Sequence, residues 1–242
     1  MGELGDRGLG DWSALNAIES TLEAMRPSET PIRVAIYGSC HSEALQRLLL
    51  GIPGVPARLE FVPVKLCMEI AADEMADFIA RLPGVDLLIY QPVSADHRGA
   101  EFATSRLVEG AGPSSRFLSF AYYHFEIYTP FITAALPTLP APPFDYMDYL
   151  LGALIAHGFS DSDVISRLLH LEGVGPYAEG ILAAAFYEVR LREERTFDGD
   201  RPLDIRIADR VEKAFRHHRL GHTLNHPARR FSSGSQATCL ST

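Results

Sequence analysis

The sequence predicts an α/β fold, a small parallel sheet flanked by helices, with a mainly helical C-terminal part. Three observations predict it. Residues 31 to 99 alternate short apolar runs with segments of helical periodicity, joined by short connections. The run "VDLLIYQPV" is continuously apolar, as a strand buried on both faces of a parallel sheet should be. From about residue 145 onward the periodicity is helical only.

The order of the elements follows from these patterns. We expect strands at 32–38, 57–64, 85–93 and 116–125. We expect helices at 42–52 and 67–84 within the sheet-forming part, and at 144–159, 160–173, 177–195 and 208–219 beyond it. Pro83-Gly84 ends the second of these helices, and a capping box at Ser160 and Asp163 opens the fourth.

The chain divides into three parts at the level of sequence. Residues 1–30 form an N-terminal extension, 31–230 a single α/β domain, and 231–242 a flexible tail of small polar residues. Within the domain, 31–135 is the sheet-forming part and 145–220 the helical part. The proline-rich stretch 136–144 separates them.

Composition narrows the class of protein. A formal net charge of −9 gives no global basic surface for nucleic acid, and the basic run from Arg216 to Arg219 is too short to argue otherwise. No apolar stretch is long enough to span a bilayer. Three cysteines with no CxxC pair predict neither a disulfide framework nor a zinc site, and no other metal site is expected. The default is a cytoplasmic protein, with monomer and homo-oligomer both left open.

Candidate site residues follow the predicted strands, because open α/β sheets bind ligands at the carboxyl ends of their strands. The first strand delivers Gly38, Ser39, Cys40 and His41. The third delivers Gln91, His97 and Arg98, and the fourth delivers His124. Near the other end of the chain, Asn225 and His226 precede a proline and are expected in an extended loop.

Cys40 is the strongest candidate, at the junction between a predicted strand and a predicted helix. The positive end of a helix dipole stabilises a thiolate, which favours a nucleophile. A small buried residue is the alternative. His41 is read either as a cap or ligand contact or as a surface histidine, and His97 either as a general base or as a solvated loop residue. Glu60 either orients a histidine, as the third member of a triad does, or is an exposed strand residue.

The ordered blocks "VAIYGSCHSEALQRLL", "DLLIYQPVSADHRG", "RFLSFAYYHFEIY" and "HTLNHP" resemble the WcbI family of bacterial capsule polysaccharide biosynthesis. That family shows Gly-Asn-Cys-Gln after a strand, then Gln-Pro, an aromatic Tyr-His-Pro block and a closing Asn-His-Pro. It is also distantly similar to SGNH hydrolases, so an SGNH-like or flavodoxin-like arrangement is expected. This sequence departs at Ser39, His41 and Phe125, where the family has asparagine, glutamine and proline.

The resemblance implies a coenzyme A-binding acetyltransferase that moves an acetyl group from acetyl-CoA to a carbohydrate hydroxyl. It implies Cys40 as nucleophile, and spacing then selects His97 and Glu60 as its partners. The implied cofactor contacts are Gly38, Ser39, His41, Gln91, Arg98, His124, Asn225 and His226. Two alternatives stay open: an SGNH-like esterase or deacetylase, and a non-catalytic protein that binds CoA or a glycan.

Overall fold

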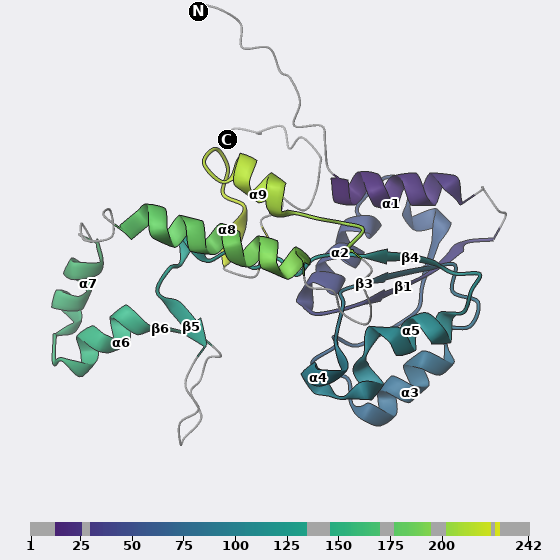
Figure 1. Cartoon of the computed structure of the whole chain (residues 1–242), viewed down its shortest axis with the longest axis horizontal. Helices are drawn as coiled ribbons and strands as arrows, with labels where there is room; N and C mark the ends of the chain where they lie inside the picture. The colour runs from purple at the N-terminus through teal and green to yellow at the C-terminus, as the bar shows by residue number, and fades with distance from the viewer. Residues whose placement is uncertain are drawn as a thin grey trace, which may run out of the picture.

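The centre of the molecule is a parallel sheet of four strands (Figure 1). They are β1 (Ile32–Tyr37), β2 (Leu59–Phe61), β3 (Leu87–Tyr90) and β4 (Arg116–Ser119), in the spatial order β2-β1-β3-β4. Each pair of neighbours is parallel, and the register pairs Tyr37 with Tyr90 and Tyr90 with Ser119. The predicted α/β fold is confirmed.

This computed structural model describes residues 13–25, 30–134, 146–169, 177–194, 202–223 and 226–227. The proline-rich stretch 136–144 and the tail 231–242, on which parts of the predicted domain division depend, lie outside the described residues. That division therefore stays a prediction.

Side chains alternate along β1 and build one apolar core on each face of the sheet. Val34 and Ile36 point to a core shared with α1 (Ser13–Ala24) and α2 (Cys40–Leu50). Ala35 and Tyr37 point to the opposite core, which α3 (Ala72–Ala80) and α5 (Thr104–Ala111) complete. Figure 1 shows the two helical layers on opposite sides of the strands. The amphipathic N-terminal helix thus belongs to the packed structure.

A parallel backbone segment extends the sheet beyond β4. Ile205 forms an isolated parallel bridge with Phe120, and its N–H donates to the Ser119 carbonyl at 2.9 Å. Asp204 Oδ2 accepts hydrogen bonds from the Ser119 N–H at 2.7 Å and hydroxyl at 2.8 Å. With this segment beside β4, the spatial order is β2, β1, β3, β4 and then the segment at Ile205, which is the flavodoxin-like order. The last part of the chain therefore returns to the sheet edge.

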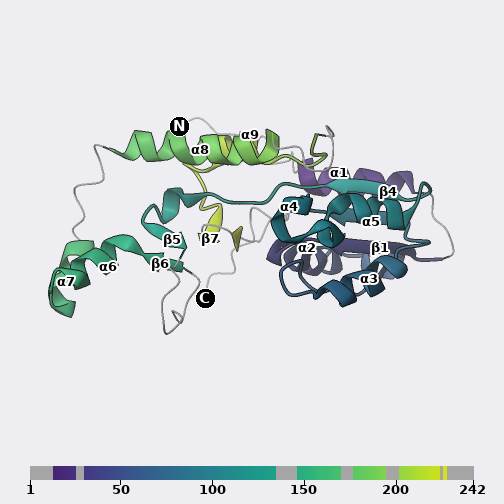
Figure 2. The same ribbon diagram turned by 60° about the horizontal axis from the view of Figure 1, so that its bottom comes forward.

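The C-terminal part extends away from the sheet, and α8 runs back toward it (Figures 1 and 2). Its helices are α6 (Tyr149–Ala156), α7 (Asp161–Leu169), α8 (Ala178–Glu194) and α9 (Ala208–Ala214). Its short strands are β5 (Ile132–Ala134) with β6 (Tyr146–Asp148), and β7 (Gly221–Thr223) with β8 (His226–Pro227), both pairs antiparallel. Four short elements lie earlier, within residues 56–128: η1 (Pro56–Arg58), α4 (Ala95–Arg98), η2 (Ala100–Phe102) and η3 (Glu126–Tyr128). A third apolar core joins α8, α9 and residues 123–128.

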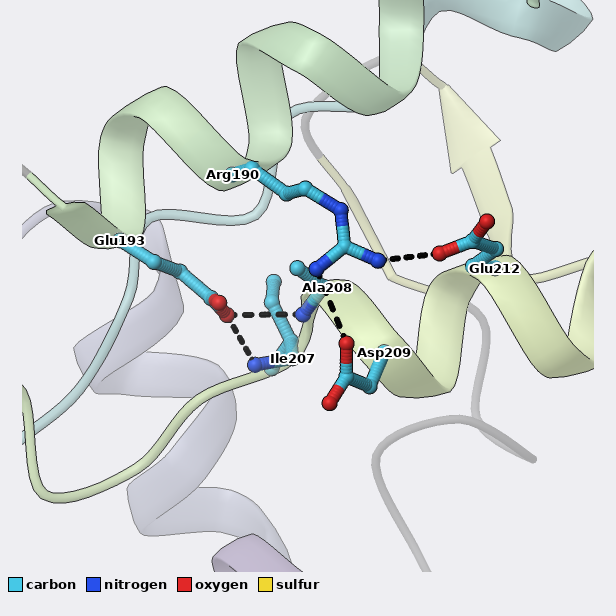
Figure 3. Close-up of polar contacts among 6 residues, drawn as sticks. All are labelled: Arg190, Glu193, Ile207, Ala208, Asp209 and Glu212. Atoms are coloured by element: carbon cyan, nitrogen blue, oxygen red, sulfur yellow. Dashed lines mark hydrogen bonds and ion pairs between the residues drawn. The ribbon is translucent and has the colours of Figure 1, made fainter. Parts of the chain in front are cut away.

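Glu193, a buried carboxylate, fixes α9 against α8 (Figure 3). Its Oε1 accepts the backbone N–H groups of Ile207 and Ala208, the latter at 2.7 Å. These N–H groups open α9 and have no partner within the helix. One turn earlier, Arg190 pairs with Asp209 at 2.9 Å and with Glu212.

Several predicted boundaries are wrong, and long-range contacts explain them. Residues 146–148 pair with β5 as a strand instead of opening the helix expected at 144–159. The helix expected from Cys67 begins only at Ala72, and residues 66–70 instead form a turn whose Cys67 N–H donates to the Gly38 carbonyl at 2.8 Å. The fourth strand ends at Ser119, before the aromatic block, and α5 is a helix that the sequence pattern did not indicate.

Candidate functional site

The switch point of the sheet lies between β1 and β3. The chain leaves β1 for β2 on one side and leaves β3 for β4 on the other, and open α/β sheets bind their ligands at the carboxyl ends of the strands where the order reverses in this way. The turn Gly38-Ser39 follows β1, and Cys40 is the first residue of α2. Gln91 follows β3 directly. The fold thus places the thiol of Cys40 where ligands bind in sheets of this order.

Gln91 holds the turn before Cys40 in place. Its Oε1 accepts both the backbone N–H and the hydroxyl of Ser39, each at 2.7 Å, and the side chain is buried. A Cβ on Gly38 would lie 2.7 Å from the same oxygen. Glycine is therefore required at position 38 for the amide to reach the turn.

His41 is buried beneath the turn, which decides against the surface-histidine interpretation. Its Nδ1 lies 2.9 Å from Ser39 Oγ and 3.3 Å from Gln91 Nε2. The two contacts make opposite demands on Nδ1: donation to Ser39 Oγ requires a proton on Nδ1, whereas acceptance from the Gln91 amide requires an Nδ1 without one. The ring also packs edge-to-face on Tyr122 at 4.8 Å between centroids. His41 therefore orders the turn and links it to the aromatic block after β4.

The loop after β2 crosses the end of β1 and brings in a second thiol. The Cys67 N–H donates to the Gly38 carbonyl, and Arg98 donates to the carbonyls of Cys67 and, at 3.3 Å, Ile70. The Arg98 guanidinium also lies over the Phe102 ring at 4.2 Å. These contacts tie Arg98 to the loop. Burial raises the pKa of the Cys67 thiol, Arg98 opposes that rise, and the charge of nearby Cys40 adds to it.

Selective alkylation tests the difference between the two cysteines. Cys40 is partly exposed, whereas Cys67 is 6% exposed and its pKa is raised. We expect iodoacetamide to modify Cys40 at least about ten times faster than Cys67 in the folded protein, since the thiolate is the reacting form. Peptide mass spectrometry over time measures both rates. Unfolding in urea should make them similar, and equal rates in the folded protein would contradict the burial of Cys67.

His124 carries a carboxylate partner, and Arg192 flanks the same ring system. His124 Nε2 lies 2.6 Å from Glu126 Oε1, and the His124 ring stacks on Tyr122 at 6.1 Å between centroids. Arg192 of α8 lies over the Tyr122 ring, with its guanidinium carbon 5.3 Å from the ring centroid. Sequence reasoning placed Tyr122 at this edge together with His124 but missed Glu126 and Arg192. A glutamate two residues after His124 was the available signal for the first.

Glu60 does not belong to this site, which corrects the predicted triad. It pairs in register with Arg33 at the start of β1, its side chain is 62% exposed, and Arg33 Nε lies 3.9 Å from Glu60 Oε1. Six residues separate Arg33 from Ser39, which is roughly 20 Å along a strand at about 3.3 Å per residue. The sheet therefore puts Glu60 and Cys40 at opposite ends.

Three predicted histidine and asparagine contacts stay predictions. His97 lies in α4, after β3, but its side chain is not among those described. His226 is placed only as backbone in β8, and Asn225 lies outside the described residues. Within the described part of the chain, no three His, Cys, Asp or Glu side chains are grouped closely enough to hold a metal ion. None of the helices described there is long and apolar enough to cross a membrane.

The order of the sheet defines an α/β protein, and a thiol lies at its switch point, the place where sheets of this kind bind ligands. The model of the family described as polysaccharide biosynthesis enzyme WcbI matches residues 33–234. This chain therefore belongs to the WcbI family of polysaccharide biosynthesis enzymes, as the sequence resemblance indicated. No curated protein matches the chain.

A solved structure of WcbI, described as a novel polysaccharide biosynthesis enzyme, is similar to this chain, with a TM-score of 0.77 and 26% sequence identity. The match covers 84% of this chain but 66% of that one, so this chain spans just under two thirds of its length. That structure is described as the native protein without a disulfide bond between coenzyme A and one of its cysteines.

Proposed function

We propose that this chain binds coenzyme A at the switch point and transfers an acetyl group from acetyl-CoA to a carbohydrate hydroxyl. The observation that carries the proposal is the position of Cys40, the first residue of α2, on a turn that Gln91 fixes. The solved WcbI is described as the native protein without a disulfide bond between coenzyme A and a cysteine, which raises the question of such a bond for that protein. Such a bond needs the CoA thiol beside a cysteine, and Cys40 is the partly exposed candidate here.

Cys40 serves as the acyl acceptor in the first half of this reaction. Its sulfur attacks the carbonyl carbon of the acetyl thioester, the bond to the CoA sulfur breaks, and the Cys40 proton passes to the departing CoA thiol. The N-terminus of α2 contributes its positive dipole end at the carbonyl oxygen, where negative charge develops. The acetyl group is then held on Cys40 as a new thioester.

His124 serves as the base in the second half. Glu126 accepts from the Nε2 side of the ring, which leaves Nδ1 as the nitrogen that takes a proton. The sugar hydroxyl attacks the acetyl carbon, its proton passes to His124, and the Cys40 sulfur leaves and receives that proton. His97 keeps its place as a predicted alternative base.

A donor-requirement experiment tests this function. Purified protein is titrated with CoA by calorimetry and then incubated with acetyl-CoA, with and without a panel of saccharides, while products are separated by mass spectrometry. We expect CoA to bind and an acetylated saccharide to form only with the thioester donor. Hydrolysis of a simple acetate ester together with no detectable CoA binding would overturn the proposal in favour of an esterase. Tight CoA binding with no acetylated product from the whole panel would favour a binding protein.

A further inference from the structure

A pocket of about 470 Å³ opens beside the end of α9. It lies where η3 and the residues after α9 meet, away from the turn that holds Cys40. Its lining consists of Tyr128, Phe215, Arg216, His217, His218 and Arg219. The pocket is wide open to solvent, so a ligand bound there keeps part of its surface in water. The reaction proposed above uses none of these residues.

The lining is basic in a chain whose formal net charge is −9. It combines two guanidinium groups, two imidazoles and two aromatic rings, and none of its residues is a carboxylate. Guanidinium groups bind phosphate and carboxylate oxygens through paired, charge-assisted hydrogen bonds. A positive pocket on an acidic protein attracts an anion selectively, because the surrounding surface repels it.

The pocket is preorganised by the Tyr128 hydroxyl. The hydroxyl donates a hydrogen bond to the His218 carbonyl at 3.1 Å and accepts one from the Leu220 N–H at 3.2 Å. These two bonds fix the turn that carries both arginines. The Arg216 guanidinium carbon lies 4.8 Å from the Phe215 ring centroid, and Arg219 Nε donates to the Gly221 carbonyl at 2.9 Å. A turn held in this way loses little further freedom on binding.

An aromatic cluster separates this pocket from His124. Phe215 packs edge-to-face on Phe125 at 6.1 Å between centroids, and Phe125 is the residue after His124. The backbone at Phe125 is extended, so adjacent side chains point to opposite sides. His124 and the pocket therefore face away from each other across Phe125, at neighbouring but separate positions.

We infer that this pocket binds an anionic sugar residue through its phosphate or carboxylate group; in an acceptor saccharide, this is a different residue from the one whose hydroxyl reaches His124. The sugar ring has the Tyr128 and Phe215 rings beside it, and the anion has Arg216 and Arg219. The acceptor role rests on the proposed acetyl transfer, whereas the binding of an anionic sugar does not. The phosphates of CoA could supply the same anionic groups to this pocket, and the experiment below distinguishes CoA from an anionic sugar as the ligand.

Binding is measured by calorimetry with inorganic pyrophosphate, glucose 1-phosphate and glucose as probes, with and without saturating CoA. The variants are Arg216→Gln and Arg219→Gln, and Lys213→Gln is a matched control that removes one positive charge from an exposed position on α9. We expect glucose 1-phosphate to bind more tightly than pyrophosphate or glucose, with or without CoA. Each pocket variant should weaken that binding roughly tenfold, and the control less than about twofold.

Three outcomes would overturn the inference. Equal losses in Lys213→Gln and the arginine variants would show a general charge effect. Tighter binding of pyrophosphate than of glucose 1-phosphate would show that the pocket does not recognise the sugar part of its ligand. Displacement of both anions by CoA, with weaker CoA binding in the arginine variants, would assign the pocket to CoA phosphates. If CoA does not bind at all but the arginine-dependent sugar phosphate binding remains, the pocket stands and the proposed function fails.

Discussion

Cys40→Ala is expected to lower the turnover number for acetyl transfer by at least about 10³-fold, because it removes the atom that accepts the acetyl group. CoA affinity should change less than about threefold, since the contacts of CoA with the rest of the site remain. Turnover is measured with acetyl-CoA and an acceptor saccharide, and affinity by calorimetry. Incubation of the native protein with acetyl-CoA alone should add the mass of one acetyl group to the peptide that carries Cys40.

Cys67→Ala is the matched control. It removes a neighbouring thiol that is buried in the core under the sheet, so it should cost about 1 to 2 kcal/mol of unfolding free energy. Turnover should stay within a few-fold of the native value, and the acetyl group should still appear on Cys40. Undiminished turnover in Cys40→Ala would contradict the covalent route. The sugar would then attack acetyl-CoA directly, with His124 as the base.

The sheet could be predicted because its strands carry their signal locally. β3 is a continuous apolar run and β1 is apolar except for Arg33, each followed by small or polar residues, and that pattern needs no knowledge of the rest of the chain. The junction from β1 to Cys40 was predictable for the same reason. The strand Tyr146–Asp148 was not, because its pairing with residues 132–134 is non-local and replaces a helical pattern.

The site could be predicted only in part. Sequence spacing tells which face of the sheet a side chain points to, but it does not tell which end of the sheet the residue lies at. Glu60 was predicted beside Cys40 because it lies in a predicted strand. The register of β1 and β2 instead pairs it with Arg33, at the end of the sheet opposite to Cys40. Gln91 was selected as the residue after β3, but its two hydrogen bonds to Ser39 depend on the β1–β3 register. Arg192 reaches Tyr122 from a helix seventy residues further along, which no local pattern indicates.

Glu193→Ala is expected to lower the free energy of unfolding by about 2 to 4 kcal/mol. It leaves the N–H groups of Ile207 and Ala208 without their carboxylate acceptor in a buried position, and a lost charged hydrogen bond costs about 1.5 to 3 kcal/mol. Glu193→Gln keeps a carbonyl oxygen at the same place, so it should cost only about 1 kcal/mol. Urea unfolding followed by circular dichroism measures the differences.

Glu194→Ala, the next residue on α8 and exposed, is the control and should change stability by less than about 0.5 kcal/mol. Amide hydrogen exchange gives a local readout: protection along α9 should fall in Glu193→Ala and persist in the control. The pocket residues 215–219 directly follow α9, so Glu193→Ala should also weaken glucose 1-phosphate binding while CoA affinity holds. Native protection of α9 in Glu193→Ala would mean that Arg190, through Asp209 and Glu212, is sufficient to hold the helix.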